Sequence, residues 1–346
     1  MAVLYDYDGD EIPVEAMDIA SGSVTMDKLA LSVKKSLVTT PEMFGAVGDG
    51  STDDTTAVQN AVNQAGIVYF GKTYRVTATI SINYSNTYIL GPGTIIGDIA
   101  TNNSCVLRCG MITEGTKDHI RITDINIRQA SGRINGGIMF THELSSGQGY
   151  MDIIIEGVSI IGMDYRGITL HGGPYNSDYV RPYFIVDKCY IVNCGDIGIC
   201  TSHVSARIQN CYIEGSGLEN ITLDNGGENQ IVIDNILKGH KGGVGSIGVD
   251  EENGVVIANN HIYCKEQSAW NSEYNSGIGF QCNTGDDTNV IVSGNVFHGG
   301  KYGIKLGGTY KAGGVFTNNV FNSIGTSAFY DKNVSTSIKD NNLEIA

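Results

Sequence analysis

The feature that most constrains the fold of this chain is a repeat that runs from residue 119 to the last residues of the sequence. Apolar segments such as IRITDINI, DIIIEGVSI and ARIQNCYI recur along it. Aligned at one apolar position, they lie 22 to 25 residues apart, with three longer intervals of 31 to 35 residues. The aligned positions are Ile122, Ile155, Val186, Ile208, Ile233, Ile257, Val292, Phe316 and Ile338. This period predicts a solenoid with one rung per repeat and with loops inserted in the longer intervals.

Each repeat also contains a second short strand, seen in GITLH, GICTS, NITLD and SIGVD. Its second and fourth residues are mostly apolar and are expected to point into the core, so the third and fifth point outward. Parallel strands in register lie about 4.8 Å apart, which predicts that the fifth residues stack in one outward column. The column consists of Thr141, His171, Ser202, Asp224, Asp250, Gln281, Gly307 and Asp331. The fold class is therefore all-β, a parallel β-helix.

Before the repeat, residues 44–65 read FGAVGDGSTDDTTAVQNAVNQA. Ser51 followed by Asp54 is typical of a capping box at the start of a helix. An apolar stripe at helical spacing follows, formed by Ala57, Val58, Ala61, Val62 and Ala65. We expect a helix at about residues 53–65 that covers the open end of the solenoid, where the first rung would otherwise expose its core.

This segment closely resembles the F-G-A-x-G-D-G-x-x-D-D-T-x-A-x-Q-x-A motif of the pectate-lyase-like superfamily, which includes polygalacturonases and many phage tailspikes. The resemblance implies a single-stranded, right-handed parallel β-helix over residues 41–346, with the motif as an end cap that has no chemistry of its own. The catalytic motifs of polygalacturonases are not matched, because residues 220–224 read NITLD and no R-I-K is present. The resemblance therefore predicts the fold and gives no mechanism.

Residues 1–40 lack the repeat and include SGSVTMDKLALSVKKSL. This stretch resembles the G-x-V-T-x-x-K-L sequences of phage tail fibres, which implies a segment that attaches the chain to a virion. A flexible leader is the alternative interpretation. The first residues have no basic segment followed by an apolar one, so we expect no secretory signal peptide.

Composition excludes two classes of partner. The formal net charge is −15, from 37 acidic and 22 basic residues without a basic run, so nucleic acid is not an expected partner. No apolar stretch approaches the roughly 18 residues of a membrane span. Long-range repulsion would also oppose acidic glycans, unless calcium or local basic side chains bridge them. Neutral polysaccharides, or uronates held through calcium, are the expected ligands.

Carboxylates in the outward column are the candidate catalytic groups. Asp224 and Asp250 are predicted to be neighbours, about one rung apart, which is near the carboxyl separation of retaining glycosidases. Like-charge neighbours raise the proton affinity of one member, so such a pair can supply an acid and a base. A reserve pair lies beside them, Glu228 and Glu251, and two histidines on earlier rungs are expected to orient substrate, His171 and His203.

Three alternatives remain for these acids. They fit a solvated surface cluster as well as an active site, since structural charge clusters are common in acidic proteins. They also fit a calcium site, because calcium prefers carboxylate and carbonyl ligands. With calcium and a basic side chain, the reaction would become β-elimination of a uronate. The register places none of the candidate bases in the acidic cluster; these are Lys188, Arg207, Lys238 and Lys241.

Other polar and aromatic residues have separate interpretations. Asparagines follow the first strand of many repeats, where we expect turns and a hydrogen-bonded ladder between rungs; they are Asn210, Asn235, Asn259, Asn260, Asn295, Asn319 and Asn341. Exposed aromatic rings can stack on sugars. Two of the inserted loops, between Ile155 and Val186 and between Ile257 and Val292, are candidate walls of a glycan groove. Their candidate substrate-binding residues are Tyr175, Tyr179, Trp270 and Tyr274.

Together, the repeat, the column and the resemblance predict a phage or prophage tailspike-like protein that binds and depolymerises a cell-surface polysaccharide. Glycoside hydrolysis is preferred over elimination, with no cofactor required and calcium as the alternative. Two other functions remain open: a non-catalytic adhesin or structural fibre, and a bacterial pectin-type lyase or hydrolase. We expect a virion or extracellular location and a homotrimer, because the leader resembles tail fibres and no capping helix follows Ile345.

Overall fold

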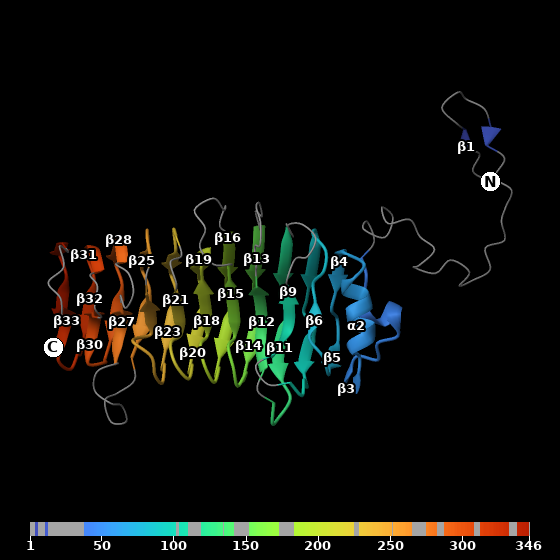
Figure 1. Cartoon of the computed structure of the whole chain (residues 1–346), viewed down its shortest axis with the longest axis horizontal. Helices are drawn as coiled ribbons and strands as arrows, with labels where there is room; N and C mark the ends of the chain where they lie inside the picture. Colours follow the sequence, from blue (N-terminus) through green and yellow to red (C-terminus); the bar gives the residue numbers. More distant parts are fainter. Residues whose placement is uncertain are drawn as a thin grey trace.

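In the computed structural model the chain forms a long solenoid whose rungs stack from an N-terminal cap towards the C-terminus (Figure 1). The structure describes residues 4–5, 11–12, 38–101, 104–109, 119–133, 135–141, 152–172, 183–224, 228–250, 252–264, 275–281, 287–307, 312–331 and 338–345. It is the predicted right-handed parallel β-helix. Within the described residues, no helix has the length and apolar character needed to cross a membrane.

Three parallel sheets run the length of the solenoid, and successive rungs contribute one strand to each. Sheet 1 has eleven strands: β4 (Gly66–Tyr69), β7 (Thr87–Leu90), β10 (Ile120–Thr123), β13 (Asp152–Glu156), β16 (Tyr183–Asp187), β19 (Ser205–Gln209), β22 (Ile231–Ile233), β25 (Val256–Ala258), β28 (Asp287–Ser293), β31 (Ala312–Thr317) and β34 (Ile338–Asp340).

Sheet 2 has twelve strands: β3 (Asp49–Asp53), β5 (Thr73–Val76), β8 (Thr94–Gly97), β11 (Asn126–Gln129), β14 (Ser159–Ile161), β17 (Tyr190–Val192), β20 (Tyr212–Glu214), β23 (Ile236–Lys238), β26 (His261–Tyr263), β29 (Val296–His298), β32 (Val320–Asn322) and β35 (Leu343–Ile345).

Sheet 3 has ten strands: β6 (Ile80–Ser81), β9 (Ser104–Cys109), β12 (Asn135–Thr141), β15 (Ile168–His171), β18 (Ile199–Ser202), β21 (Ile221–Asp224), β24 (Ile247–Val249), β27 (Ser276–Phe280), β30 (Tyr302–Leu306) and β33 (Ser327–Asp331). Two further strands form a separate antiparallel pair, β1 (Leu4–Tyr5) and β2 (Glu11–Ile12). Apart from these two strands and residues 38–40, the predicted attachment segment, residues 1–40, lies outside the described residues.

A sharp corner between sheets 1 and 2 divides segments that the sequence presents as one strand. IRITDINI, for example, forms the whole of sheet 1 strand β10, a corner at Asp124, and the start of sheet 2 strand β11. Asp124 has φ of 55°, the left-handed conformation that Asn, Asp and Gly adopt most readily. The same corner position holds Gly157, Lys188, Asn210, Asp234, Asn259, Gly294, Asn318 and Asn341, all with positive φ. A rung therefore has three strands, one more than the repeat predicts.

Strand pairing confirms most of the predicted alignment of the repeats and corrects it by one residue at two rungs. Ile208 pairs with Val232, and the predicted partner Ile233 lies one residue further along. At the last rung Phe316 pairs with Lys339, so the predicted position Ile338 is also displaced by one residue. Val232 is the buried residue of its strand, whereas Ile233 is half-buried on the outer face. The core contact therefore sets the register.

A ladder of buried asparagine side chains follows this corner on consecutive rungs. Asn260 accepts hydrogen bonds from the backbone N–H and the side-chain amide of Asn235, at 3.0 and 2.9 Å. Its own amide donates to the Val232 carbonyl at 2.9 Å. The ladder continues through Asn295, Asn319 and Asn342, and Cys189 and Cys211 occupy the preceding rungs. The predicted ladder is confirmed for Asn235, Asn260, Asn295 and Asn319, whereas Asn210, Asn259 and Asn341 form the left-handed corner.

The N-terminal cap is helix α2 (Thr55–Val62), shorter than the predicted residues 53–65, preceded by the short 3-10 helix η2 (Pro41–Phe44). All five residues of the predicted apolar stripe are buried. The predicted capping residue Ser51 is wrong, because the N-cap is Asp54. The Asp54 carboxylate instead accepts the N–H groups of Val47 and Gly48, at 2.8 and 3.0 Å, and so holds the preceding glycine-rich turn.

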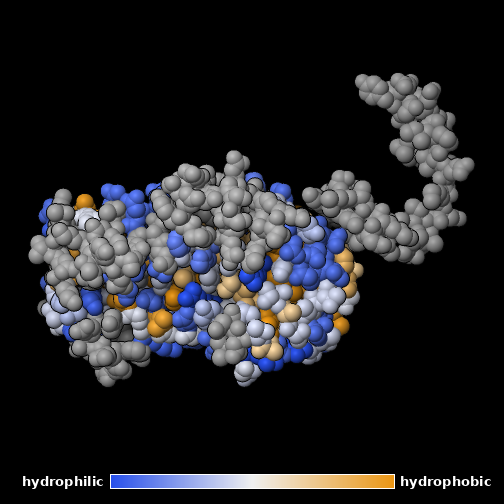
Figure 2. All heavy atoms as spheres, viewed as in Figure 1, coloured by the Kyte–Doolittle hydropathy of each residue, from blue (hydrophilic) through white to orange (hydrophobic). Residues whose placement is uncertain are grey.

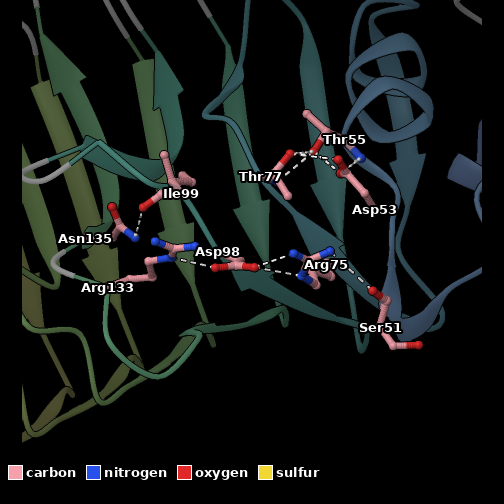
Figure 3. A network of polar contacts seen from close by, with 9 residues as sticks. All are labelled: Ser51, Asp53, Thr55, Arg75, Thr77, Asp98, Ile99, Arg133 and Asn135. Atoms are coloured by element: carbon pink, nitrogen blue, oxygen red, sulfur yellow. Dashed lines mark hydrogen bonds and ion pairs between the residues drawn. The ribbon is translucent and has the colours of Figure 1, made fainter.

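Polar contacts tie this cap to the first rungs (Figure 3). Thr55 Oγ1 accepts the Thr77 N–H at 2.7 Å, and Thr77 donates its hydroxyl to Asp53 at 2.8 Å. Further along, Asp98 lies between two guanidinium groups, and Arg133 Nε and Arg75 Nε donate to it at 2.6 and 2.9 Å. These hydrogen bonds lower the pKa of Asp98. The network joins the cap to the first rungs.

Candidate functional site

The outward column predicted on sheet 3 is present in the structure. Thr141 pairs with His171, His171 with Ser202, and Ser202 with Asp224, each on the next rung. The column continues at Asp250, whose N–H donates to the Leu223 carbonyl at 2.9 Å. Asp224 and Asp250 therefore lie on adjacent rungs at the end of their strands, and both are half-buried. The period-2 pattern of the sequence predicted this juxtaposition correctly.

The far end of the column differs from the prediction by one residue. Gln281 and Gly307 follow Asp250 as expected, through hydrogen bonds from their N–H groups to Val249 and Phe280. Asp331, however, pairs with Leu306 and not with Gly307. The cause is Phe329, whose ring packs edge-on against the buried rings of Phe316 and Phe321, with centroids 6.3 and 5.2 Å away. Phe329 therefore takes the inward position assigned to its neighbours Ala328 and Tyr330, because its ring fills the core better.

The two candidate histidines lie beside the aspartates on the same edge of sheet 3. The rings of His171 and His203 stack with centroids 5.9 Å apart. Ser202 Oγ lies 3.0 Å from His203 Nδ1, within hydrogen-bonding distance. Because Ser202 pairs with both His171 and Asp224 along the column, the histidines and the first aspartate occupy consecutive rungs. The predicted substrate-orienting residues are thus correctly placed next to the acids.

The other predicted site residues divide between described and undescribed segments. Glu228 follows the undescribed residues 225–227, is half-buried, and forms an isolated parallel bridge with Asn253 on the next rung. Glu251, Trp270, Tyr274, Tyr175 and Tyr179 lie outside the described residues.

Three of the candidate bases of an elimination reaction lie away from the acidic edge, whereas Lys241 lies between β23 and β24, two residues before Gly243. Lys188 forms an ion pair with Glu156 at 2.7 Å on sheet 1, and Arg207 lies in sheet 1 strand β19. Lys238 belongs to sheet 2, where its Nζ lies over the rings of Tyr212 and Tyr263. Within the ranges that the structure describes, no group of three or more His, Cys, Asp or Glu side chains could hold a metal ion.

Sequence reasoning missed a second polar cluster on the same face of sheet 3. Arg166 Nε donates to the Asp196 carboxylate at 2.9 Å, and Arg166 Nη1 donates to Cys200 Sγ at 3.5 Å. Cys200 occupies the outward position in the middle of β18 and is buried. Burial raises the pKa of its thiol to about 11, Arg166 opposes this shift, and the nearby carboxylates of Asp224, Asp196 and Glu219 add to it. The cluster therefore adjoins the predicted aspartate.

Glu219 is the most unusual member of this cluster because its carboxyl is buried. Its side chain is 8% exposed and accepts the Val244 N–H at 2.9 Å. Burial raises the pKa of Glu219, the hydrogen bond from the Val244 N–H opposes this shift, and the charge of Asp196 adds to it. Glu219 stands in SGLENITLD, just before a strand, where the inward and outward alternation does not apply. No signal in the sequence shows that residues 243–244 cover it.

Beside the residues drawn in grey, the face viewed in Figure 2 shows many hydrophilic residues with smaller hydrophobic patches. The hydrophilic residues offer hydrogen-bonding groups on this face. Sugar hydroxyls are matched by such groups, and rigid parallel strands hold them at a regular spacing of about 4.8 Å.

Comparison with known proteins agrees with the resemblance seen in the cap motif. Residues 42–115 match the family described as rhamnogalacturonase A/epimerase, pectate lyase-like. Over 310 residues the chain is 25% identical to a protein of Klebsiella phage K64-1 named "Depolymerase, capsule K30/K69-specific", covering 82% of this chain and 34% of that protein. It is 28% identical over 228 residues to the pre-neck appendage protein of Bacillus phage B103, covering 58% of this chain and 26% of that protein.

The chain thus spans about a third or less of the length of these two curated relatives. Among solved structures, the enzymatically active domain of tailspike protein 2 of bacteriophage CBA120 superposes with a TM-score of 0.66 at 16% identity. That match covers 87% of this chain and 47% of the tailspike chain, and it shows that the two share a fold. These findings support the tailspike-like, pectate-lyase-like resemblance that the cap motif predicts.

Proposed function

We propose that this chain is the glycan-binding β-helix of a phage tailspike-like protein and that it hydrolyses a cell-surface polysaccharide along sheet 3. The observation that carries the proposal is the placement of Asp224 and Asp250 on adjacent rungs of one outward edge. His171 and His203 lie on the rungs before them. The name of the Klebsiella phage relative, a capsule-specific depolymerase, supports the same class of activity.

The proposed chemistry is glycoside hydrolysis by paired carboxyl groups. Adjacent rungs of a parallel sheet lie about 4.8 Å apart, close to the roughly 5 Å separation of carboxyls in retaining glycosidases. In this reaction one carboxyl protonates the leaving oxygen while the second stabilises or attacks the anomeric carbon. Three of the candidate bases for elimination, Lys188, Arg207 and Lys238, lie on or beside other sheets, which supports hydrolysis.

The test is a screen of the protein against capsular, lipopolysaccharide, teichoic and pectic glycans, with reducing ends and unsaturated products as separate readouts. On a glycan that the protein cleaves, Asp224→Asn and Asp250→Asn should each lower turnover by roughly 10²-fold or more, as expected for loss of a catalytic acid or base. Binding should remain, since asparagine keeps the shape. Asp152→Asn on sheet 1 is the matched control and should keep wild-type turnover.

Other outcomes would identify the alternative functions. Tight binding without released products would show a non-catalytic adhesin, and unsaturated products that disappear with a calcium chelator would show a calcium-dependent lyase. A hydrolase of the proposed kind keeps its activity in chelator. Wild-type turnover in both aspartate variants would place the catalytic groups elsewhere.

A further inference from the structure

A ladder of stacked side chains runs along the outer face of sheet 2. The rings of Tyr190 on β17 and Tyr212 on β20 have centroids 5.2 Å apart and planes that differ by 15°. Lys238 on β23 follows, with its Nζ 5.1 Å from the Tyr212 ring centroid and 5.3 Å from that of Tyr263 on β26. The Tyr263 ring then stacks on His298 of β29 with centroids 4.3 Å apart. The ladder therefore runs over consecutive rungs from β17 to β29.

The first ring of this ladder has one face without an aromatic or cationic neighbour among the described residues. The Tyr212 ring lies between Tyr190 and Lys238, so it has a neighbour on each side. Tyr190 stacks on Tyr212 on one side only, and the residue that pairs with it on the preceding rung is Ser159. A serine side chain is too short to cover a phenol ring, and Tyr190 is 45% exposed. One face of the Tyr190 ring is therefore open above Ser159.

The space above Ser159 has a different chemical group on each side. Ile161, two residues further along β14, is 45% exposed. On the other side, Gly157 forms the corner before β14, and a Cβ atom at this position would lie 2.2 Å from Asp124 Oδ1. The exposed Asp124 carboxylate thus extends over the corner. We call this space the Tyr190 notch; it is bounded by Tyr190, Ser159, Ile161 and Asp124.

These groups match the chemistry of one sugar ring. A hexopyranose has an apolar face of C–H groups, which suits the open face of an aromatic ring, and a rim of hydroxyls. The Ser159 hydroxyl and the Asp124 carboxylate can form hydrogen bonds with that rim. A rung is about 4.8 Å high, so a sugar stacked on Tyr190 would lie above Ser159, where one more ring of the ladder would lie. The negative charge of Asp124 opposes a uronate at this position.

We propose that the Tyr190 notch binds one neutral hexopyranose residue of a polysaccharide, as a binding subsite on sheet 2 separate from the acidic edge of sheet 3. A polysaccharide presents many copies of the same sugar, so a second contact on the same solenoid raises the effective concentration of the polymer at the protein. The subsite needs no cleavage. It therefore goes beyond the proposed function and does not depend on it.

The test follows the Tyr190 ring by fluorine NMR of the full chain labelled with fluorotyrosine. The resonance that is missing in Tyr190→Phe is that of Tyr190. Titration with the methyl glycosides of glucose, galactose and mannose at millimolar concentrations should shift this resonance until it saturates. Sorbitol, which has hydroxyls but no ring, should leave the resonance in place.

A variant that fills the notch gives the sharpest result. Ser159→Tyr adds a ring that continues the ladder, so the Tyr190 resonance should no longer respond to any of the glycosides. The matched control is Thr94→Tyr, because Thr94 occupies the same column of sheet 2 three rungs before Tyr190 and is also half-buried. This control should keep the response. Circular dichroism reports whether each variant is folded.

Each outcome decides for or against the subsite. A Tyr190 resonance that none of the three glycosides shifts overturns the inference, and so does an equal response in folded Ser159→Tyr, since the sugar would then bind elsewhere. A shift that follows protein concentration instead of glycoside concentration overturns it in favour of a second copy of this chain in the notch.

The same measurement separates this inference from the proposed function. Asp224→Asn on sheet 3 should keep the glycoside response of Tyr190 whatever its turnover. If the wild type cleaves no glycan but Tyr190 responds, the subsite stands and the proposed function fails. If the wild type cleaves a glycan while the Tyr190 resonance stays fixed, only the subsite is overturned.

Discussion

At the scale of single residues, asparagine has two different roles at the corner between sheets 1 and 2. Asn259 adopts the left-handed conformation with φ of 56°, and the next residue, Asn260, is buried in the ladder. The sequence predicts asparagine corners because both roles suit its short amide side chain. It does not separate the roles, since whether an amide points outward or into the ladder depends on the corner geometry.

The same limit explains which site residues the sequence could predict. Asp224 and Asp250 are placed correctly because strand alternation and rung spacing alone bring them together. Glu219 lies at a corner, and the group that buries it, Val244, is 25 residues away in the sequence. A carboxyl whose environment is created by a distant loop has no local signature.

A buried imidazole gives a prediction for the dependence of stability on pH. His240 is 4% exposed, and burial lowers its pKa to about 4. The unfolded chain, with an ordinary histidine pKa near 6.5, binds the proton more readily than the folded chain. The contribution of neutral His240 to the free energy of unfolding is therefore fully present above about pH 6.5. It is lost as the pH falls towards 4, and the free energy of unfolding decreases by about 3 kcal/mol from this residue.

The measurement is the free energy of unfolding of wild type and His240→Asn between pH 7 and 4. The difference between the two proteins should change with pH, because asparagine does not titrate. His119→Asn, which replaces an exposed histidine, is the matched control. Parallel curves for His240→Asn and wild type would contradict the prediction.

At the scale of strands, a run of consecutive apolar residues leaves the register of a rung undetermined by the sequence. Ile231, Val232 and Ile233 are all compatible with the core, so alternation does not show which of them points inward. The structure selects Val232, because the left-handed corner at Asp234 fixes the end of the strand. Runs of three apolar residues also end at Ile155 and Val186, and the register of these two rungs was predicted correctly.

The asparagine ladder predicts a strong local dependence of stability on one side chain. Asn260→Ala leaves the buried backbone N–H and amide of Asn235 without their acceptor and the Val232 carbonyl without its donor. Each unsatisfied buried group costs about 1–3 kcal/mol, so we expect a loss of several kcal/mol near this rung. Hydrogen exchange should show faster opening of β22 and β25 in the variant. Asn83→Ala, at an exposed position, should leave the exchange of these strands unchanged.

At the scale of the whole molecule, the three outer faces differ in chemistry. Sheet 3 presents acids and histidines, and sheet 2 presents a mixture of rings and charges, such as Tyr190, Glu214 and Lys238. The central outward column of sheet 1 is mainly aliphatic over consecutive paired rungs: Ile154, Ile185, Arg207, Ile231, Val256, Ile291 and Val315. Arg207 interrupts this column, and Ile291 and Val315 are its exposed members. Apolar surface repeated over neighbouring rungs is typical of an interaction face.

This column leads to the prediction that sheet 1 is the face through which the expected homotrimer assembles. Ile291 is 44% and Val315 36% exposed, so covering the column removes apolar surface from water. Three copies related by a threefold axis would each use this face and leave the acidic edge of sheet 3 open to a glycan. The double variant Ile231→Lys and Ile291→Lys should sediment as a monomer at micromolar concentration while its circular dichroism stays that of the wild type.

The matched control is Ile161→Lys and Ile236→Lys on sheet 2, where the side chains are 45% and 41% exposed. This control should remain a trimer, because the added charges lie on a different face. A wild-type protein that sediments as a monomer would contradict assembly, and loss of the trimer only in the sheet 2 variant would move the interface to that sheet.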